Sequence, residues 1–134
     1  MKTLVWVFAA LLLSGCSMKM YNSMTPEQAS ELSSRMPTCS SEAECERKWA
    51  AARNWILSNA DMKIQHITSD YIETFNGSSR NGGIIGDMSA RVTKNPLGNG
   101  VYAIRIETWC SFKLGCSPGK YETEKSFIEA VNAL

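Results

Sequence analysis

Four of the five cysteines stand in two equally spaced pairs, and they constrain the fold more than any other feature of the chain. Five residues separate Cys39 from Cys45, and five separate Cys110 from Cys116. Four cysteines allow three disulfide connectivities. We favour the two local pairs, because each spacing brackets an expected junction between a loop or strand and a helix. A loop of this size contributes about 2–2.5 kcal/mol in the chain-entropy account of disulfides.

A tetrahedral zinc site with four thiolate ligands is the alternative use of these cysteines. Structural zinc sites usually show knuckles with two to four residues between the cysteines, and the spacing here is wider. An oxidising compartment, which the N-terminus indicates below, also favours disulfides over thiolates. We therefore expect no metal ligands among them.

The first fifteen residues have the parts of a secretory signal peptide. Lys2 precedes an unbroken apolar run over residues 4–13, about half of the roughly 20 residues that a membrane-spanning helix needs. The following Leu13-Ser14-Gly15-Cys16 resembles the lipobox of bacterial lipoproteins at every position. An ordinary secretory signal with a chance cysteine is the alternative.

The lipobox resemblance implies a lipid anchor at Cys16. In that family a diacylglycerol is added to the thiol, the leader is cleaved before the cysteine, and the new amine is usually acylated. A residue other than Asp after the cysteine, here Ser17, usually directs Gram-negative lipoproteins to the outer membrane. Two or more acyl chains hold a protein stably on a membrane. We expect an outer-membrane protein whose domain faces the periplasm.

The chain therefore divides into a signal peptide (1–15), a lipidated cysteine with its tether (16–24) and one domain (25–134). A composition of 44% hydrophobic and 20% charged residues is typical of a globular chain. The formal net charge is only +1. A nucleic-acid binder needs clustered basic charge to displace counterions from phosphate, so we expect no nucleic-acid partner.

Helix start signals appear at two places in the first half of the domain. Thr25 is an expected N-cap, Pro26 occupies the first helical position and Gln28 completes a capping box. This helix is short, because it has to end before Pro37. A second helix is expected to start at Ser41 with acidic residues in its first turn. Its apolar stripe consists of Cys45, Trp49, Ala52 and Ile56.

Three stretches predict strands: residues 62–75, 84–94 and 101–109. The first alternates imperfectly, which a bulge near Ser69-Asp70 or cover on both sides would explain. Asn81-Gly82 is a strong hairpin signal before the second, and residues 95–100 form the turn before the third. In the second strand we expect Met88, Ala90 and Val92 to face one way and Ser89, Arg91 and Thr93 the other. In the third we expect Tyr102, Ile104 and Ile106 to face the helices and Arg105 and Glu107 to face away.

A last helix is expected to start at Ser117-Pro118, with its buried face made of Phe127, Ile128, Val131 and Leu134. The predicted fold is α+β: a short helix, then a helix, a three-stranded antiparallel meander and a helix, in a two-layer sandwich held by two disulfides. The two amphipathic helices are the only available cover for one sheet face.

Catalytic constellations are not evident in the sequence. His66 is the single histidine and is expected in mid-strand, and carboxylate pairs such as Asp70 with Glu73 occur in any chain with thirteen acids. The glycine-rich stretch 77–83 lacks a phosphate-loop ending and precedes a strand, so it predicts a hairpin turn. We expect no cofactor. A small envelope-directed hydrolase that uses carboxylates or His66 is the alternative function.

Aromatic residues indicate a candidate interaction surface. Trp49 and Trp55 lie about 240° apart around their helix at ~100° per residue, so they cannot share one narrow seam. Trp109 has the same parity as the outward-facing Arg105 and Glu107. Exposed tryptophans are enriched in protein interfaces, although Trp109 could instead pack on its neighbouring disulfide and Trp55 on the helix edge. The leading hypothesis is a non-enzymatic module that binds another envelope protein or a cell-wall component through Trp109, Arg105, Glu107 and Trp55.

Overall fold

The computed structural model describes residues 23–80, 85–112 and 115–134. Its helices are α2 (Pro26–Ser34), α3 (Glu42–Asn59) and α4 (Lys120–Asn132). One sheet consists of β1 (Thr38–Cys39), β2 (Ile64–Ile67), β3 (Tyr71–Thr74), β6 (Met88–Gly98) and β7 (Val101–Cys110). A small second sheet pairs β4 (Ser79–Arg80) with β5 (Ile85–Gly86). No helix within the described residues is long and apolar enough to span a membrane.

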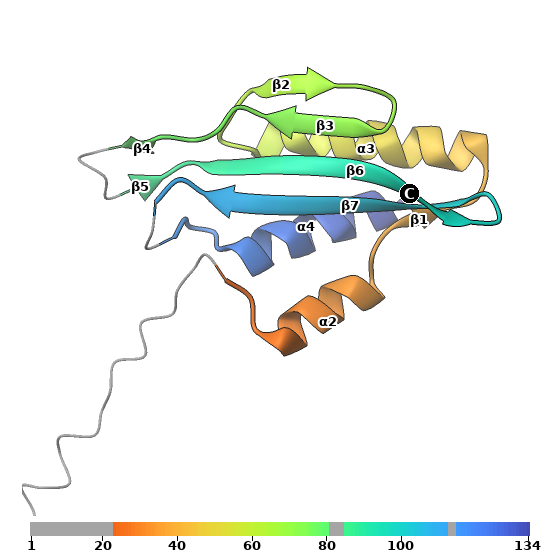
Figure 1. The fold of residues 1–134 in the computed structure, drawn as a ribbon, viewed down its shortest axis with the longest axis horizontal. Helices are drawn as coiled ribbons and strands as arrows, with labels where there is room; N and C mark the ends of the chain where they lie inside the picture. Colours follow the sequence, from red (N-terminus) through yellow and green to blue (C-terminus); the bar gives the residue numbers. More distant parts are fainter. Residues whose placement is uncertain (1–22, 81–84, 113–114) are drawn as a thin grey trace, which may run out of the picture.

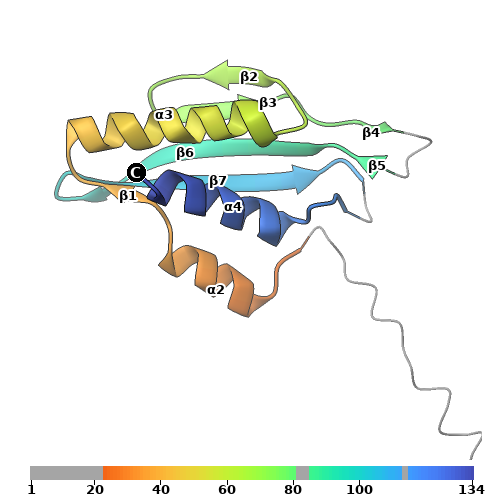
Figure 2. The same ribbon diagram turned by 180° about the vertical axis from the view of Figure 1, so that it is seen from behind.

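The five-stranded sheet and two helices form two layers, as expected for an α+β sandwich. The strand order is β1-β7-β6-β3-β2, and every neighbouring pair is antiparallel. Figure 1 shows the strands in front of α3 and α4, and Figure 2, from behind, shows these helices covering the sheet. In both views α2 lies beside α4, beyond the β7 edge. One face of the sheet is therefore covered by helices and the other is open.

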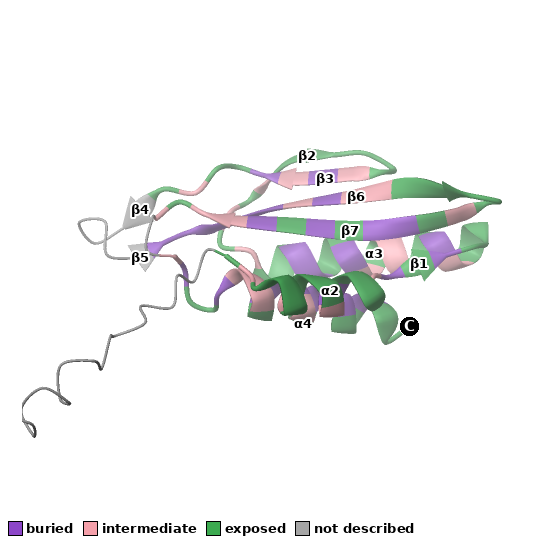
Figure 3. Ribbon diagram, turned by 60° about the horizontal axis from the view of Figure 1, so that its bottom comes forward, coloured by how far each residue is buried: buried purple, intermediate pink, exposed green. Residues whose placement is uncertain are grey.

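The core lies between the sheet and the two long helices. Along β7 buried and exposed residues alternate (Figure 3), which places Ile104 and Ile106 inside and Arg105 and Glu107 outside, as predicted. The expected stripe on α3 is also confirmed, because Cys45, Ala52 and Ile56 are buried. The core cluster consists of Leu32, Ala52, Trp55, Ile56, Ile72, Ala90, Val92, Ile104, Ile106, Phe127, Ile128 and Val131.

The predicted three-stranded meander is wrong at its first strand. Residues 62–75 form a hairpin of β2 and β3 rather than one strand, so the meander has four strands and β1 adds a fifth at the edge. The Thr68 hydroxyl donates to Asp70 Oδ1 at 2.7 Å, and the Thr68 N–H donates to the Tyr71 carbonyl at 2.7 Å. These bonds close a side-chain-stabilised turn where we expected a bulge. The register shift lies instead between Ile64 and His66.

Several finer predictions need correction at the ends of elements. α4 begins at Lys120 with Gly119 as N-cap, after a cis Ser117-Pro118 bond, so the proline does not start the helix. Leu134 lies past the helix end and is 64% exposed. Tyr102 has the inward parity but lies at the end of β7, where it is 37% exposed.

Three outcomes concern β6 and the turns that flank it. β6 continues to Gly98, so the turn before β7 is shorter than the predicted 95–100. Ser89 faces away from the helices, yet it is buried because its hydroxyl accepts the Gly77 N–H at 2.7 Å. The predicted Asn81-Gly82 turn lies outside the described residues.

Both local disulfides are present and each ties a strand to the helix that follows it. Cys39 in β1 bonds Cys45 in α3, with a Cα–Cα distance of 5.1 Å. Cys110 ends β7 and bonds Cys116, four residues before α4, with a Cα–Cα distance of 5.7 Å. The predicted pairing is confirmed, and each bridge restrains the direction in which a helix leaves the sheet.

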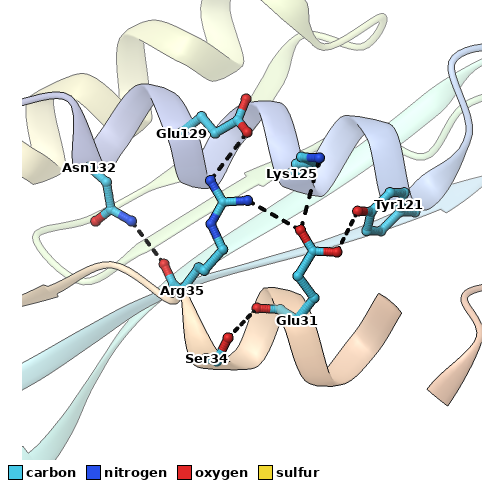
Figure 4. A network of polar contacts seen from close by, with 7 residues as sticks. All are labelled: Glu31, Ser34, Arg35, Tyr121, Lys125, Glu129 and Asn132. Carbon is cyan, nitrogen blue, oxygen red and sulfur yellow. Dashed lines mark hydrogen bonds and ion pairs between the residues drawn. The ribbon is translucent and has the colours of Figure 1, made fainter. Parts of the chain in front are cut away.

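A polar network fastens α2 to α4 (Figure 4). The Tyr121 hydroxyl donates to Glu31 Oε2 at 2.7 Å, and Arg35 donates to both Glu31 and Glu129 at 3.2 Å. The Asn132 amide donates to the Arg35 carbonyl at 2.8 Å. The hydrogen bond from Tyr121 is the main reason that the pKa of Glu31 lies below its ordinary value. These charged side chains are about half exposed, so each pair stabilises the docking of α2 only slightly.

The alternation along β7 predicts opposite effects for two neighbouring substitutions. Ile104 is fully buried, so Ile104→Ala leaves a cavity and costs about 2–5 kcal/mol of unfolding free energy. Arg105→Ala changes an exposed side chain and costs less than about 0.5 kcal/mol. Urea denaturation of the two variants measures both values. A silent Ile104→Ala with a destabilised Arg105→Ala contradicts the orientation of the strand.

Acid should weaken the docking of α2 through Glu31. Its pKa in the folded protein lies below the ordinary 4.5, so its ionised form stabilises the fold above that pH and this contribution is lost as the pH falls through the folded-state pKa. Glu31→Gln should therefore lower the melting temperature slightly at pH 7, with the difference shrinking below pH 4. Thermal melts across this range, with exposed Glu46→Gln as the control, test the sign; a difference that grows in acid contradicts it.

Candidate functional site on the open face of the sheet

The open face of the sheet carries two rows of polar residues that cross its strands. The register of the strand pairs aligns His66, Glu73, Arg91 and Glu107 in one row. The neighbouring row consists of Tyr71, Thr93 and Arg105. Because side chains of one row project from the same side of a pleated sheet, these residues form a continuous surface. We call these two rows, together with Trp109, the open-face cluster.

An ion pair between Arg91 and Glu107 stands at the centre of this cluster. The Arg91 hydrogen bond is the largest cause that holds the pKa of Glu107 below its ordinary value, with smaller contributions from Lys120 and Arg105. The same bond, followed by one with Tyr71, raises the pKa of Arg91. Glu107 thus stays ionised and Arg91 cationic at neutral pH.

Trp109 continues the cluster toward the end of β7. Its indole N–H donates to Asn76 Oδ1 at 3.1 Å, and the Arg91 guanidinium lies 6.0 Å from its ring centroid. The ring is half-buried and has two polar partners that fix its orientation. A tryptophan held in one orientation at a sheet surface offers contact area without a large loss of side-chain entropy on binding.

A shallow hollow of about 710 Å³ opens between this cluster and the end of α2. Arg105 borders it and is exposed, and its guanidinium forms no ion pair with any described residue. The hollow is lined by Ser33, Ser34, Met36, Thr38, Tyr71, Arg91, Thr93, Asn95, Leu97, Ala103, Arg105 and Glu107. The surface can therefore offer a free cation, hydroxyl groups and an aromatic ring to a ligand.

Three of the four predicted surface residues come together here, and the fourth does not. Arg105, Glu107 and Trp109 share the open face. Trp55 is only 8% exposed and packs edge-to-face on Phe127, with ring centroids 5.4 Å apart, so it belongs to the core and offers no surface. Its helical position alone did not reveal which neighbour would cover it.

Sequence reasoning left out Arg91, Tyr71 and Asn76. The outward parity of Arg91 was visible in the predicted strand, and it would have indicated a cross-strand partner for Glu107 if the register had been known. Tyr71 was placed in a single long strand, and its neighbour Thr93 becomes apparent only once the β2–β3 hairpin exists. Nothing in the sequence brings Asn76 to Trp109.

Of the residues considered for the enzymatic alternative, His66 and Glu73 face each other across β2 and β3, and Asp70 accepts the Thr68 hydroxyl in the turn between these strands. His66 lies on the edge strand, and neither it nor Glu73 lines the hollow beside Arg91 and Arg105. His66 is exposed and Glu73 only half-buried, so water reaches the pair. Among the described residues no cluster of three or more His, Cys, Asp or Glu side chains could hold a metal ion. Cys16 lies outside the described residues.

Comparison with known proteins yields no relative for this chain. No protein-family model matches it, and neither a curated protein nor a solved structure is similar to it.

Proposed function

We propose that this chain is a lipid-anchored protein of the bacterial outer membrane whose domain binds another envelope protein through the open-face cluster. The observation that carries the proposal is that Arg105, Glu107 and Trp109 stand together on a sheet face that α3 and α4 leave uncovered. The module is non-enzymatic.

The proposed anchor rests on the N-terminal sequence. Leu13-Ser14-Gly15-Cys16 resembles a lipobox, and Ser17 is compatible with transfer to the outer membrane. Residues 17–24 then connect the lipid to α2, a stretch that spans at most ~28 Å when fully extended. The domain would remain within that distance of the membrane surface, where envelope proteins are its neighbours. Two disulfides suit this oxidising compartment.

Binding has more support than catalysis. The strongest electrostatic feature of the open face is a satisfied ion pair, Arg91 with Glu107, which keeps an acid ionised. A general acid needs the opposite shift, toward a raised pKa. Arg105 beside this pair remains available to a partner's carboxylate, and arginine and tryptophan are the residue types that contribute most at protein interfaces.

The anchor is tested by replacing the lipobox cysteine. Cys16→Ala should abolish leader processing and labelling by a fatty-acid probe, because the thiol is the acceptor of the lipid. Metabolic labelling and fractionation of cells that express either form measure this. If the variant is still cleaved and labelled, the anchor is not at Cys16.

The open-face cluster is tested by crosslinking in intact cells. A photo-reactive side chain at position 105 should trap a discrete partner adduct from the lipidated protein, whereas the same group at Arg53, an exposed arginine on α3, should not. Arg105→Ala and Trp109→Ala should weaken the adduct formed from a probe at position 93, and Arg105→Ala should leave the melting temperature nearly unchanged. Equal adducts from positions 105 and 53 contradict the proposed surface.

A further inference from the structure

Two parts of the chain supply hydrogen-bond partners at the two ends of the outer edge of β7. At one end Cys39 of β1 pairs with Tyr102, and the Ile104 N–H donates to the Pro37 carbonyl at 2.8 Å. At the other end the side chains of α4 take the place of a strand. Glu124 accepts the Thr108 N–H at 2.8 Å, and the Lys120 ammonium donates to the Thr108 carbonyl.

Ile106 lies between these two capped ends. In an antiparallel strand alternate residues direct both backbone groups to the same side. Since Ile104 and Thr108 direct theirs to the outer edge, and the register with β6 is regular between them, Ile106 does so too. Within the described residues no group pairs with its N–H or carbonyl. Neither backbone group of Ile106 therefore has a hydrogen-bond partner among the described residues, and the residue as a whole is only 6% exposed.

These backbone groups border a groove between β7 and α2. Its volume is about 340 Å³, at the lower end of the range for ligand pockets. We call it the α2 groove; it is lined by Met24, Ala29, Leu32, Ser33, Met36, Ile104, Arg105, Ile106, Glu107, Lys120, Glu124 and Ile128. Apolar side chains from α2 and α4 form its walls. Arg105, which has no ion-pair partner among the described residues, lies at its rim.

We propose that the α2 groove binds a short extended peptide segment of a partner protein, with one residue paired to the Ile106 backbone. A donor and an acceptor on one edge-strand residue match the N–H and carbonyl of one residue of an added strand. The apolar walls favour an aliphatic side chain on that residue, and Arg105 favours an acidic neighbour. This inference goes beyond the open-face cluster, because it concerns the edge of the sheet and not its face.

The groove can adapt to such a segment. Met24 and Met36 are unbranched and flexible, a property that suits surfaces which repack around a ligand. α2 is held by Leu32 in the core and by half-exposed polar contacts with α4, namely Arg35 with Glu129 and Tyr121 with Glu31, and each such ion pair contributes little. The capped ends restrict the segment to one paired residue, and the expected affinity is correspondingly weak, with a dissociation constant on the order of a millimolar.

The experiment uses the acetylated tripeptide amide Glu-Leu-Glu as the probe, because an antiparallel leucine can exchange both hydrogen bonds with Ile106 and carries an acidic residue on either side. Titrated into the ¹⁵N-labelled mature full chain in detergent, it should shift the amide resonance of Ile106 and slow its hydrogen exchange. The same tripeptide with an N-methylated leucine cannot donate to the Ile106 carbonyl and should bind at least several-fold more weakly. If the peptide leaves Ile106 unchanged, or if both peptides bind equally, the proposal is overturned.

Ala29→Phe and Trp109→Ala separate this site from the open-face cluster, whereas Arg105 borders both. Ala29→Phe fills the mouth of the groove from an exposed helical position and should weaken peptide binding tenfold or more, while Ala50→Phe on α3 is the matched control without effect. Arg105→Gln should weaken it about two- to fivefold, as expected for one exposed ion pair. Trp109→Ala, which affects only the open face, should leave it unchanged.

Two other outcomes overturn the proposal. A peptide whose binding depends on Trp109 and not on Ala29 occupies the open face instead. The Ile106 amide could also be protected from hydrogen exchange already in the free chain. If deletion of residues 17–22 removes this protection, the chain's own N-terminal segment occupies the groove.

Discussion

The edge-to-face contact between Trp55 and Phe127 is the interaction on which the two-layer arrangement depends. It joins α3 to α4 directly above the sheet, with the ring planes at 90° and the Trp55 indole N–H donating to the Ser126 hydroxyl at 3.3 Å. The two large side chains fill the space between the helices and rest on the apolar residues of β3, β6 and β7. Both long helices pack on this face, and within the described residues no helix covers the opposite face of the sheet.

The packing of α3 and α4 on one face of the sheet also explains why the charged residues lie on the other face. The open face has to be compatible with water, and its central strands carry Arg91 and Glu107 opposite each other. The outer edge of β7 is hydrogen-bonded by β1 at one end. At the other end the α4 side chains Lys120 and Glu124 bond its backbone in place of a neighbouring strand. Exposed strand edges attract other chains, so Ile106, whose backbone groups have no partner among the described residues, is a place where this protection is incomplete.

Local signals in the sequence predicted the elements that depend on neighbouring residues. The capping box of Thr25 with Gln28 is present at the start of α2, and the Ser41 N-cap starts α3. Strand β7 alternates as its sequence indicates. The failure at residues 62–75 has a local cause as well. Thr68 and Asp70 close a turn through their own side chains, and a turn without glycine or proline is easily taken for an irregular strand.

By itself, the sequence determined the α+β class, the two local disulfides and the inward face of β7. It also determined that Arg105, Glu107 and Trp109 lie on the same face of that strand. All of these follow from periodicity or short spacing along the chain. Only the tertiary structure decided that Trp55 is core, that β1 becomes an edge strand, and that α2 and β7 enclose a groove beside Ile106. These features depend on which distant segments meet, and contacts such as Trp55 with Phe127 leave no local pattern in the sequence because the two residues lie far apart along the chain.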